Sequence, residues 1–216
     1  ADKRQDILEN RKIVASQFNQ PASQLVTMFQ VHGTGVAVVD QPWAPDQAPE
    51  VDGIVTSKPG IVLGALAADC APILFADTQA QIIGACHAGW RGAVDGIAQA
   101  TIDTMVDQGA NRDHITAVIG PCIGPHSYEV GPDFPAPFMA QDDANAAFFA
   151  PGDGDRLLFD LPGYLTRRLH QAGLSDVTWV GDDTLSNPDR FFSYRRSCHQ
   201  QEPDYGRQVS VIMLTP

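Results

Sequence analysis

The order of the apolar runs is the feature that most constrains the fold of this sequence. Residues 61–67, 73–76 and 81–86 are apolar runs of strand length with only short turns between them. Other patterns predict strands at residues 25–31, 36–39 and 116–119 and near Val177, Phe191 and Val209. Helical spacing predicts helices at residues 2–18, 94–109, 137–149 and 161–172. Because strands and helices alternate only in part, the sequence predicts an α+β fold, with mixed β-sheets layered with helices.

The length and charge of the chain limit the classes of protein to which it can belong. With 216 residues, of which 44% are hydrophobic, we expect a single domain over residues 1–216. The net charge of -12 repels phosphate backbones and anionic lipid, which argues against nucleic acid and membranes as partners. The sequence shows no long apolar span and no signal peptide, so the expected location is cytoplasmic. Ala1 stands where an initiator methionine is expected, which suggests a trimmed start.

Three residues that suit a transition metal follow three of the predicted strands. They are His32 in "FQVHGTG", Cys70 in "AADCAP" and His87 in "ACHAGWRG". Two imidazoles and one thiolate suit Zn²⁺, and three protein ligands with an open fourth position are typical of a catalytic zinc site. The alternative is that Cys70 is a small core residue and that backbone carbonyls satisfy the two histidines. Since all three follow strands beside glycine or proline, we predict a metal site.

The segment "HAGWRG" also indicates a binding site for an anion. A strand turns through glycines directly into a helix, so that backbone amides and the helix dipole point outward. Arg91 and the amides near Gly92 are therefore candidate ligands of an oxyanion. The alternative for Arg91 is a surface ion pair with one of the many carboxylates. The remaining cysteines are expected in the core (Cys86 and Cys122) or in a polar tail (Cys198), and not in a disulfide framework.

A series of short motifs, in order along nearly the whole chain, resembles the YfiH-like proteins. The motifs are "QVHG" at residues 30–33, "DG" at 52–53, "ADCAPIL" at 68–74, "HAGWRG" at 87–92, "IGPCIG" at 119–124, "YEV" at 128–130, "FFSYRR" at 191–196 and "GRQ" at 206–208. This family carries two descriptions, multicopper polyphenol oxidase ("laccase domain") and purine nucleoside phosphorylase. The resemblance implies a four-layer α/β/β/α fold related to a bacterial toxin deamidase.

The resemblance also implies a zinc ion held by His32, Cys70 and His87. The implied activity is phosphorolysis of adenosine, inosine, guanosine and methylthioadenosine to the base and ribose 1-phosphate, with adenosine deamination alongside. Deamination needs a carboxylate that moves protons, and Asp69 is the carboxylate nearest to Cys70 in sequence. Its alternative role is to cap or support the turn. The expected partners are thus purine nucleosides and phosphate, whereas the preferred nucleoside and the oligomeric state stay open.

Two departures from the family pattern are visible. Members usually begin with a strand and an Arg-Gly-Gly-type segment before the first helix, so we expect that this N-terminal strand segment is missing here. The usual Cys-Thr before "FFSYRR" is Asp183-Thr184, so either a cysteine is dispensable at that place or the local packing differs.

Three alternative functions stay open at this stage. A true multicopper oxidase is not among them, because it needs many imidazoles, generally with His-x-His pairs, and this chain has 6 His and no such pair. Copper loaded at the predicted zinc site could still give weak phenol oxidation, because Cu²⁺ binds most such sites more tightly than Zn²⁺. A metal-independent hydrolase or deamidase would use Cys70 as nucleophile and His87 or His32 as its base. A protein that only stores metal or binds a partner is the third alternative.

Overall fold

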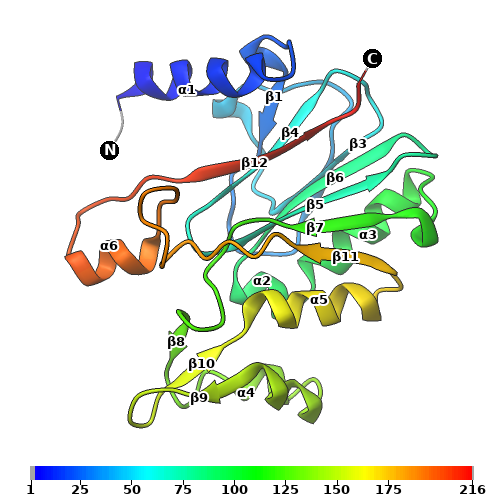
Figure 1. The fold of residues 1–216 in the computed structure, drawn as a ribbon. Coiled ribbons are helices and arrows are strands. Elements are labelled where there is room, and N and C mark those ends of the chain that lie inside the picture. Colours follow the sequence, from blue (N-terminus) through cyan, green and yellow to red (C-terminus); the bar gives the residue numbers. More distant parts are fainter. Residues whose placement is uncertain (1–2, 216) are drawn as a thin grey trace.

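A six-stranded mixed sheet forms the centre of the molecule (Figure 1). The computed structural model describes residues 3–215. The strands lie in the order β11-β7-β5-β6-β3-β2. Their bounds are β2 Val36–Val38, β3 Gly53–Thr56, β5 Ala71–Asp77, β6 Ile82–Ala88, β7 Thr116–Ile119 and β11 Asp176–Trp179. The four inner strands run antiparallel to one another, whereas the edge strands β2 and β11 run parallel to β3 and β7.

A second sheet packs on one face of the first. It consists of β4 (Val62–Ala67) between β1 (Leu25–Thr27) and β12 (Gln208–Met213). Apolar side chains of both sheets, among them Leu63 and Ile83, form a buried cluster between them. The central strand β4 is an unbroken apolar run because both of its faces are buried.

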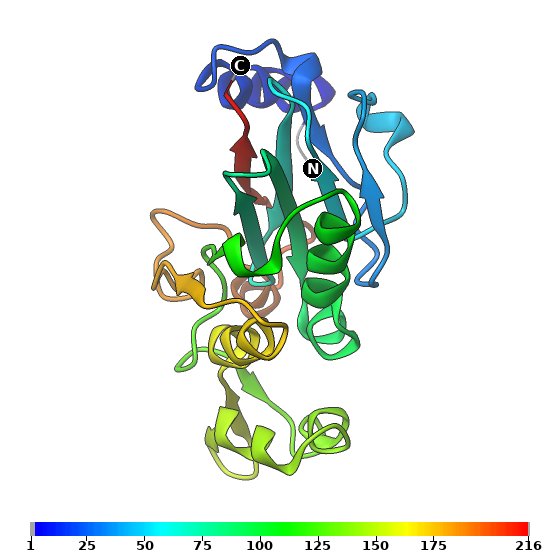
Figure 2. The same cartoon turned by 90° about the vertical axis from the view of Figure 1, so that its right-hand side faces the viewer.

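Helices cover the two outer faces, so that the molecule has four layers (Figures 1 and 2). The helix α1 (Arg4–Ser16) packs on the second sheet, where Ala15 contacts the cluster with Leu25 and Val62. On the other side, α2 (Trp90–Asp95), α3 (Ile97–Asp107) and α5 (Leu161–Gln171) cover the six-stranded sheet. The expected α+β fold with an α/β/β/α order of layers is confirmed. No helix within residues 3–215 is long and apolar enough to span a bilayer.

A small third sheet extends from the end of the molecule (Figure 1). It consists of β8 (Glu129–Val130), β10 (Leu157–Phe159) and β9 (Phe149–Pro151), with the short helix α4 (Ala136–Met139) beside it. Aromatic rings hold this unit together; the ring centroids of Phe138 and Phe159, for example, lie 4.7 Å apart. Short 3₁₀ turns lie at residues 22–24, 45–47, 112–114 and 143–148.

Several predicted elements were wrong in extent or type. The helix predicted at 94–109 is part of two helices, because Gly96 adopts a left-handed φ of 99° between α2 and α3. The helix predicted at 137–149 is α4 followed by a 3₁₀ turn, since the Asp142 carboxylate caps a new turn at the Ala144 amide. The strand predicted at 25–31 ends at Thr27.

The strand predicted near Phe191 is absent from the described chain, and a helix that was not predicted follows instead. This helix is α6 (Tyr194–Gln200), and the Ser193 hydroxyl caps it by accepting from the Arg196 amide. The strands β3, β8, β9 and β10 were also missed. The predicted helix at 2–18 corresponds to α1, although Asp2 lies outside the described residues.

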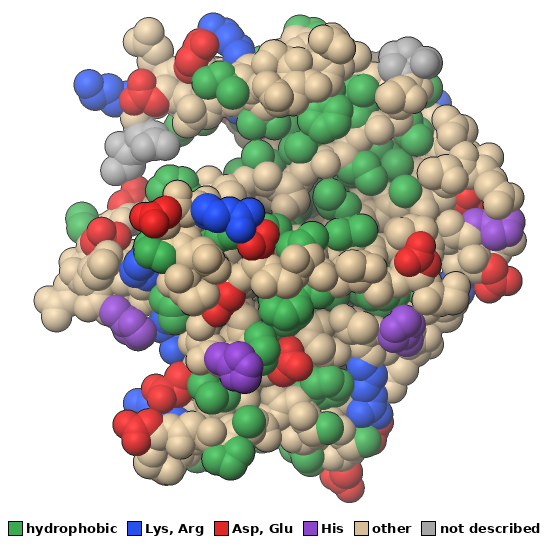
Figure 3. Space-filling model, in the orientation of Figure 1, with side chains coloured by type: hydrophobic (Ala, Val, Ile, Leu, Met, Phe, Trp, Pro, Cys, Tyr) green, Lys and Arg blue, Asp and Glu red, His purple; other side chains and the backbone are tan. Residues whose placement is uncertain are grey.

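Hydrophobic side chains line a hollow beneath α1 (Figure 3). This cavity of about 530 Å³ lies between α1 and the second sheet, with Val14, Leu25 and Val209 among its lining residues. It contains none of the predicted metal ligands, and it therefore plays no part in the site described below.

Candidate metal centre

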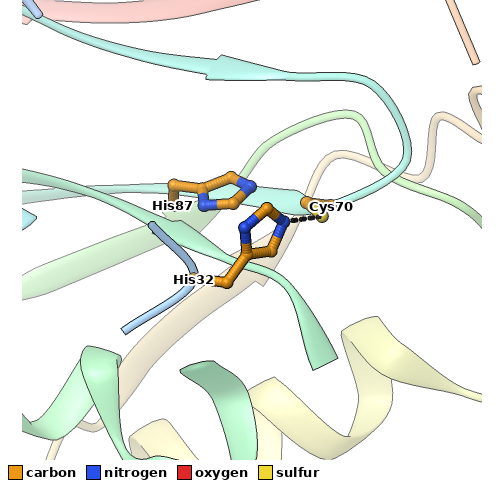
Figure 4. Close-up of side chains that lie close together, drawn as sticks. All are labelled: His32, Cys70 and His87. Carbon is orange, nitrogen blue, oxygen red and sulfur yellow. Dashed lines mark hydrogen bonds between the residues drawn. The ribbon is translucent and has the colours of Figure 1, made fainter. Parts of the chain in front are cut away.

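His32, Cys70 and His87 converge at one end of the six-stranded sheet (Figure 4). Their ligand atoms all lie within 4.8 Å of one another, and the Cys70 Sγ is 3.9 Å from the His32 Nε2. The antiparallel register of β5 and β6 explains part of this, because it pairs Pro72 with His87 and places the start of β5 beside the end of β6. His87 ends its strand nearly as predicted. Cys70 instead comes directly before β5, and His32 lies in the loop between β1 and β2.

The carboxylate of Asp52 orients the two histidines. It accepts hydrogen bonds from the amides of Val31 (3.1 Å), His32 (3.0 Å) and Gly33 (2.7 Å), and so holds a loop in which His32 has a left-handed φ of 60°. The same carboxylate lies 2.9 Å from the His87 Nδ1, which must donate, because an ionised carboxylate only accepts. The His87 Nε2 is thereby left free for a metal. In the sequence, Asp52 stands out only as part of the family motif "DG".

The electrostatics of this cluster favour a thiolate at Cys70. Burial opposes ionisation of the thiol, but hydrogen bonds and charge from His32 and His87 outweigh it and lower the pKa of Cys70 to about 7. Burial likewise lowers the pKa of His87, but Asp52 and Cys70 outweigh that effect and raise it to about 9. The pKa of Asp52 is lowered, since hydrogen bonds from His87, Gly33 and Val31 outweigh its burial. A thiolate is also the form of cysteine that binds a metal.

The residues fit a zinc ion in donor type and in spacing. A tetrahedral ion with Zn–N of about 2.0–2.1 Å and Zn–S of about 2.3 Å holds its ligand atoms roughly 3.3–3.7 Å apart. Small rotations of the three side chains would bring their observed separations to these values. Gly89 leaves room for such a cluster, because a Cβ there would lie 2.9 Å from the His32 Cδ2 and 3.1 Å from the Cys70 Sγ.

We therefore expect the substitution Gly89→Ala to reduce zinc binding. The added methyl group would displace His32 and Cys70, while the backbone of Gly89, at φ -69°, accommodates alanine without strain. The expected loss of zinc affinity is about 10- to 100-fold, as for other changes that misorient metal ligands. Competition with a chromophoric chelator measures it, with Gly131→Ala as the control because a Cβ at Gly131 has no atom within 4 Å. Equal zinc affinities of the two variants would contradict the expectation.

Asp69 supports the turn that carries Cys70. Its carboxylate accepts hydrogen bonds from the Thr184 hydroxyl (2.7 Å), the Ser193 hydroxyl (2.9 Å) and the Arg195 amide (2.6 Å). Its φ of 80° lies in the left-handed region, which non-glycine residues adopt only where their surroundings hold them. Asp69 thus has its two oxygens occupied and connects the Cys70 turn to the segment that enters α6.

A cavity of about 830 Å³ opens onto the candidate metal centre. His32, Cys70 and Asp69 are among its lining residues, whereas His87 is buried behind them. Aromatic rings form part of the wall, with the centroids of Trp90 and Phe134 5.0 Å apart. The cavity also has basic side chains in its wall, namely Arg91, Arg156, Arg195 and His199.

Arg91 and Gly92, the two residues predicted to bind an oxyanion, differ in their exposure to the cavity. Arg91 is exposed, lines the cavity and lies 5.1 Å from the ring centroid of Trp90. Gly92 is buried and does not line the cavity; a Cβ there would lie 3.2 Å from the Gly33 carbonyl oxygen. Contact of a ligand with the amides near Gly92 therefore stays a prediction, while the lack of a side chain at Gly92 lets α2 approach the loop that carries His32.

The other cysteines lie where the sequence predicted. Cys86 and Cys122 are fully buried, Cys198 is exposed, and all four cysteines are free thiols. Burial raises the pKa of Cys86 to about 12 and also raises that of Cys122. Cys70 differs from these two buried cysteines, because its pKa is lowered.

In the metal-free protein we expect Cys70 to react with iodoacetamide with a half-maximal rate near pH 7. An ordinary thiol reaches that point at about pH 8.5, because only the thiolate reacts. The measurement is the pH dependence of alkylation at Cys70, followed by mass spectrometry in a Cys198→Ser background. Zinc should slow the reaction. A midpoint above pH 8 would show that the two histidines do not stabilise the thiolate.

Comparison with known proteins finds relatives that are similar to this chain in sequence and in structure. A family described as "Multi-copper polyphenol oxidoreductase laccase" matches residues 1–215. A purine nucleoside phosphorylase of Rickettsia conorii is 35% identical over 97% of this chain and 85% of its own length. The purine nucleoside phosphorylase YfiH of Escherichia coli is 36% identical over 95% and 80%. The crystal structure of the hypothetical protein YfiH of Bacillus licheniformis has a TM-score of 0.91, with 28% identity over 99% of this chain and 83% of that one.

Proposed function

This chain belongs to the multi-copper polyphenol oxidoreductase laccase family of YfiH-like proteins, and from that premise we propose that it is a zinc-dependent purine nucleoside phosphorylase. The observation that carries the proposal is the position of the His32–Cys70–His87 cluster, which opens onto a cavity with both aromatic and cationic walls. A nucleoside and a phosphate ion together require such a combination. The names of the relatives support the same reaction.

The proposed reaction transfers a ribosyl group to phosphate. A phosphate oxygen bonds to C1′ of the ribose, the bond from C1′ to the purine nitrogen breaks, and the base leaves with the electron pair and takes up a proton. Held phosphate and an oriented base are what the protein must supply. Zinc held by His32, Cys70 and His87 would supply a Lewis acid at the mouth of the cavity.

Side chains of the cavity have distinct parts in this proposal. Trp90 and Phe134 offer ring faces on which a purine can stack. Arg91 is the proposed phosphate contact at the start of α2. We assign Asp69 a positioning role in place of proton transfer, because three donors already occupy its carboxylate. Adenosine deamination, implied by the family resemblance, would use the same cavity.

The test is incubation of zinc-loaded protein with inosine or adenosine, with and without phosphate. Mass spectrometry should find free base and ribose 1-phosphate only where phosphate is present. Release of inosine from adenosine would identify deamination. Absence of base from both nucleosides would overturn the proposal.

A cysteine–histidine hydrolase or deamidase is the second candidate. It is favoured by the lowered pKa of Cys70 and by the 3.9 Å separation of its Sγ from the His32 Nε2. Such an enzyme would survive a chelator and lose activity on alkylation. The proposed phosphorylase would lose activity with the chelator and recover with zinc.

A multicopper oxidase finds little support in the described chain. Within residues 3–215, His32, Cys70 and His87 are the one group of at least three His, Cys, Asp or Glu ligands close enough for an ion. A multicopper centre needs ligands for several ions. Copper bound at this one site would give weak phenol oxidation at most.

A further inference from the structure

Arg195 lines the same cavity as Cys70 and His32 but comes from a different part of the chain, the first turn of α6. Its side chain is half-buried and lies 5.5 Å from the ring centroid of Tyr128, and its Nη1 donates to the Glu129 carbonyl oxygen at 2.7 Å. Within residues 3–215 it has no ion pair with a carboxylate. Most of its N–H groups are thus available to a ligand in the cavity.

The neighbouring Arg196 shows what a structural arginine looks like in this segment. Its guanidinium donates to the carbonyl oxygens of Thr184, Leu185 and Phe191, so backbone acceptors use its donors. Elsewhere, Arg112, Arg167 and Arg190 each pair with an aspartate. The three arginines that line the cavity, Arg91, Arg156 and Arg195, have no such ion pair within residues 3–215, which leaves their charge available to an anionic ligand.

Asp69 fixes the position of Arg195 relative to the metal ligands. Its carboxylate accepts from the Arg195 amide at 2.6 Å, and the next residue in the chain is Cys70. The Ser193 hydroxyl, which caps α6, also donates to Asp69. The backbone of Arg195 is therefore held beside the Cys70 turn, and the Glu129 carbonyl oxygen holds its guanidinium, so that the group is in place before any ligand arrives, as binding of a small ion requires.

His199 lies on the same face of α6. It is four residues beyond Arg195, a spacing that brings side chains together on a helix, and it also lines the cavity. Arg156, on the turn between β9 and β10, adds a third basic group to the wall. A tetrahedral oxyanion is the ligand that matches a forked guanidinium with further donors around it.

We propose that Arg195 and His199, on one face of α6, form a binding site for inorganic phosphate and for the phosphate group of a ribose 1-phosphate product. The inference rests on the proposed function and adds to it a second phosphate contact besides Arg91. It also explains the position of Asp69, because this one carboxylate stabilises the Cys70 turn and holds the backbone of the phosphate-binding arginine.

The test compares Arg195→Gln, Arg195→Lys and His199→Gln with the unaltered protein, all loaded with zinc. Calorimetric titration with inorganic phosphate measures binding without reference to turnover. Arg195→Gln should weaken phosphate binding about 30-fold, as expected for loss of hydrogen bonds to a charged group. Arg195→Lys should lose less, because it keeps the charge but not the fork, and His199→Gln should lose less still. Arg4→Gln, at an exposed position on α1, is the control and should bind phosphate as before.

Steady-state kinetics provide the second measurement. In Arg195→Gln the KM for phosphate should rise together with the dissociation constant for phosphate. The KM for the nucleoside should change less than about threefold, because Arg195 is proposed to contact only the phosphate. Unchanged phosphate binding in Arg195→Gln would overturn the inference even if phosphorolysis is observed. Phosphate binding that depends on Arg195, without release of base from any nucleoside, would overturn the proposed function and the binding of a ribose 1-phosphate product, and would leave only the site for inorganic phosphate. If Arg195→Gln does not fold, unchanged phosphate affinity in Arg195→Lys overturns the inference.

Discussion

Replacement of Cys70 by alanine is expected to remove zinc and phosphorolysis together. Cys70 is the one thiolate among the three ligands, and its Sγ lies 3.9 Å from the His32 Nε2. Loss of a supporting residue alone weakens metal binding about 10- to 100-fold, so loss of a ligand should exceed that. We expect a zinc content near zero after dialysis and activity below about 1% of the unaltered protein. Elemental analysis and release of hypoxanthine from inosine measure the two effects.

The control for this change is Cys198→Ala, which removes an exposed thiol and should alter neither quantity. Zinc retained by Cys70→Ala at the level of the unaltered protein would exclude Cys70 as a ligand. Zinc absent from the unaltered protein, with an activity that resists chelators and is lost in Cys70→Ala, would favour the cysteine–histidine enzyme.

Substitution of Asp52 should have the next largest effect, and it should act on both stability and metal binding. The side chain is fully buried and accepts from three amides and from His87. Asp52→Ala leaves these donors without a partner, which we expect to lower the free energy of unfolding by roughly 3–5 kcal/mol. Zinc affinity should fall about 10- to 100-fold, because neither His32 nor His87 is then oriented. Asp52→Asn, which turns one acceptor into a donor, should show smaller losses in both.

Asp77 offers a matched control for Asp52. It is also fully buried, and its carboxylate accepts from the amides of Gln79, Ala80 and Asn111, but it lies at the far end of β5. Asp77→Asn should therefore lower the free energy of unfolding without changing zinc affinity. Urea denaturation and chelator competition separate the two quantities. Equal losses of zinc affinity in Asp52→Asn and Asp77→Asn would show that Asp52 acts only through stability.

The core strands and the metal ligands can be predicted from the sequence, whereas the residues that hold the ligands in position by hydrogen bonds cannot. The strands β4, β5 and β6 are apolar on both faces, so each can be recognised as a continuous apolar run without knowledge of the strands that pair with it. His32, Cys70 and His87 were recognised by ligand chemistry, and the structure brings them together although two of the three do not end strands.

Support of the Cys70 turn was one of the two roles considered for Asp69, but its partners and the role of Asp52 could not be predicted, because the contacting residues are distant in sequence. Asp52 acts on an amide 20 residues before it and on a ring 35 residues after it, and no local pattern records such contacts. Asp69 and Arg195 are 126 residues apart. Helix α6 depends on the Ser193 cap, whereas the preceding Phe191 and Phe192 resemble strand residues. In each case a long-range contact or a capping side chain outweighs local preference.

The hydrogen bonds of Asp69 also have a consequence for biosynthesis. All three of its donors lie in residues 184–195, at least 115 residues beyond Asp69. A nascent chain that has emerged from the ribosome only as far as β7 already contains His32, Cys70 and His87, but the turn before Cys70 still lacks the groups that restrain it. We therefore expect tight zinc binding only after residues 184–195 have been synthesised, so that a chain terminated before them would not retain the ion.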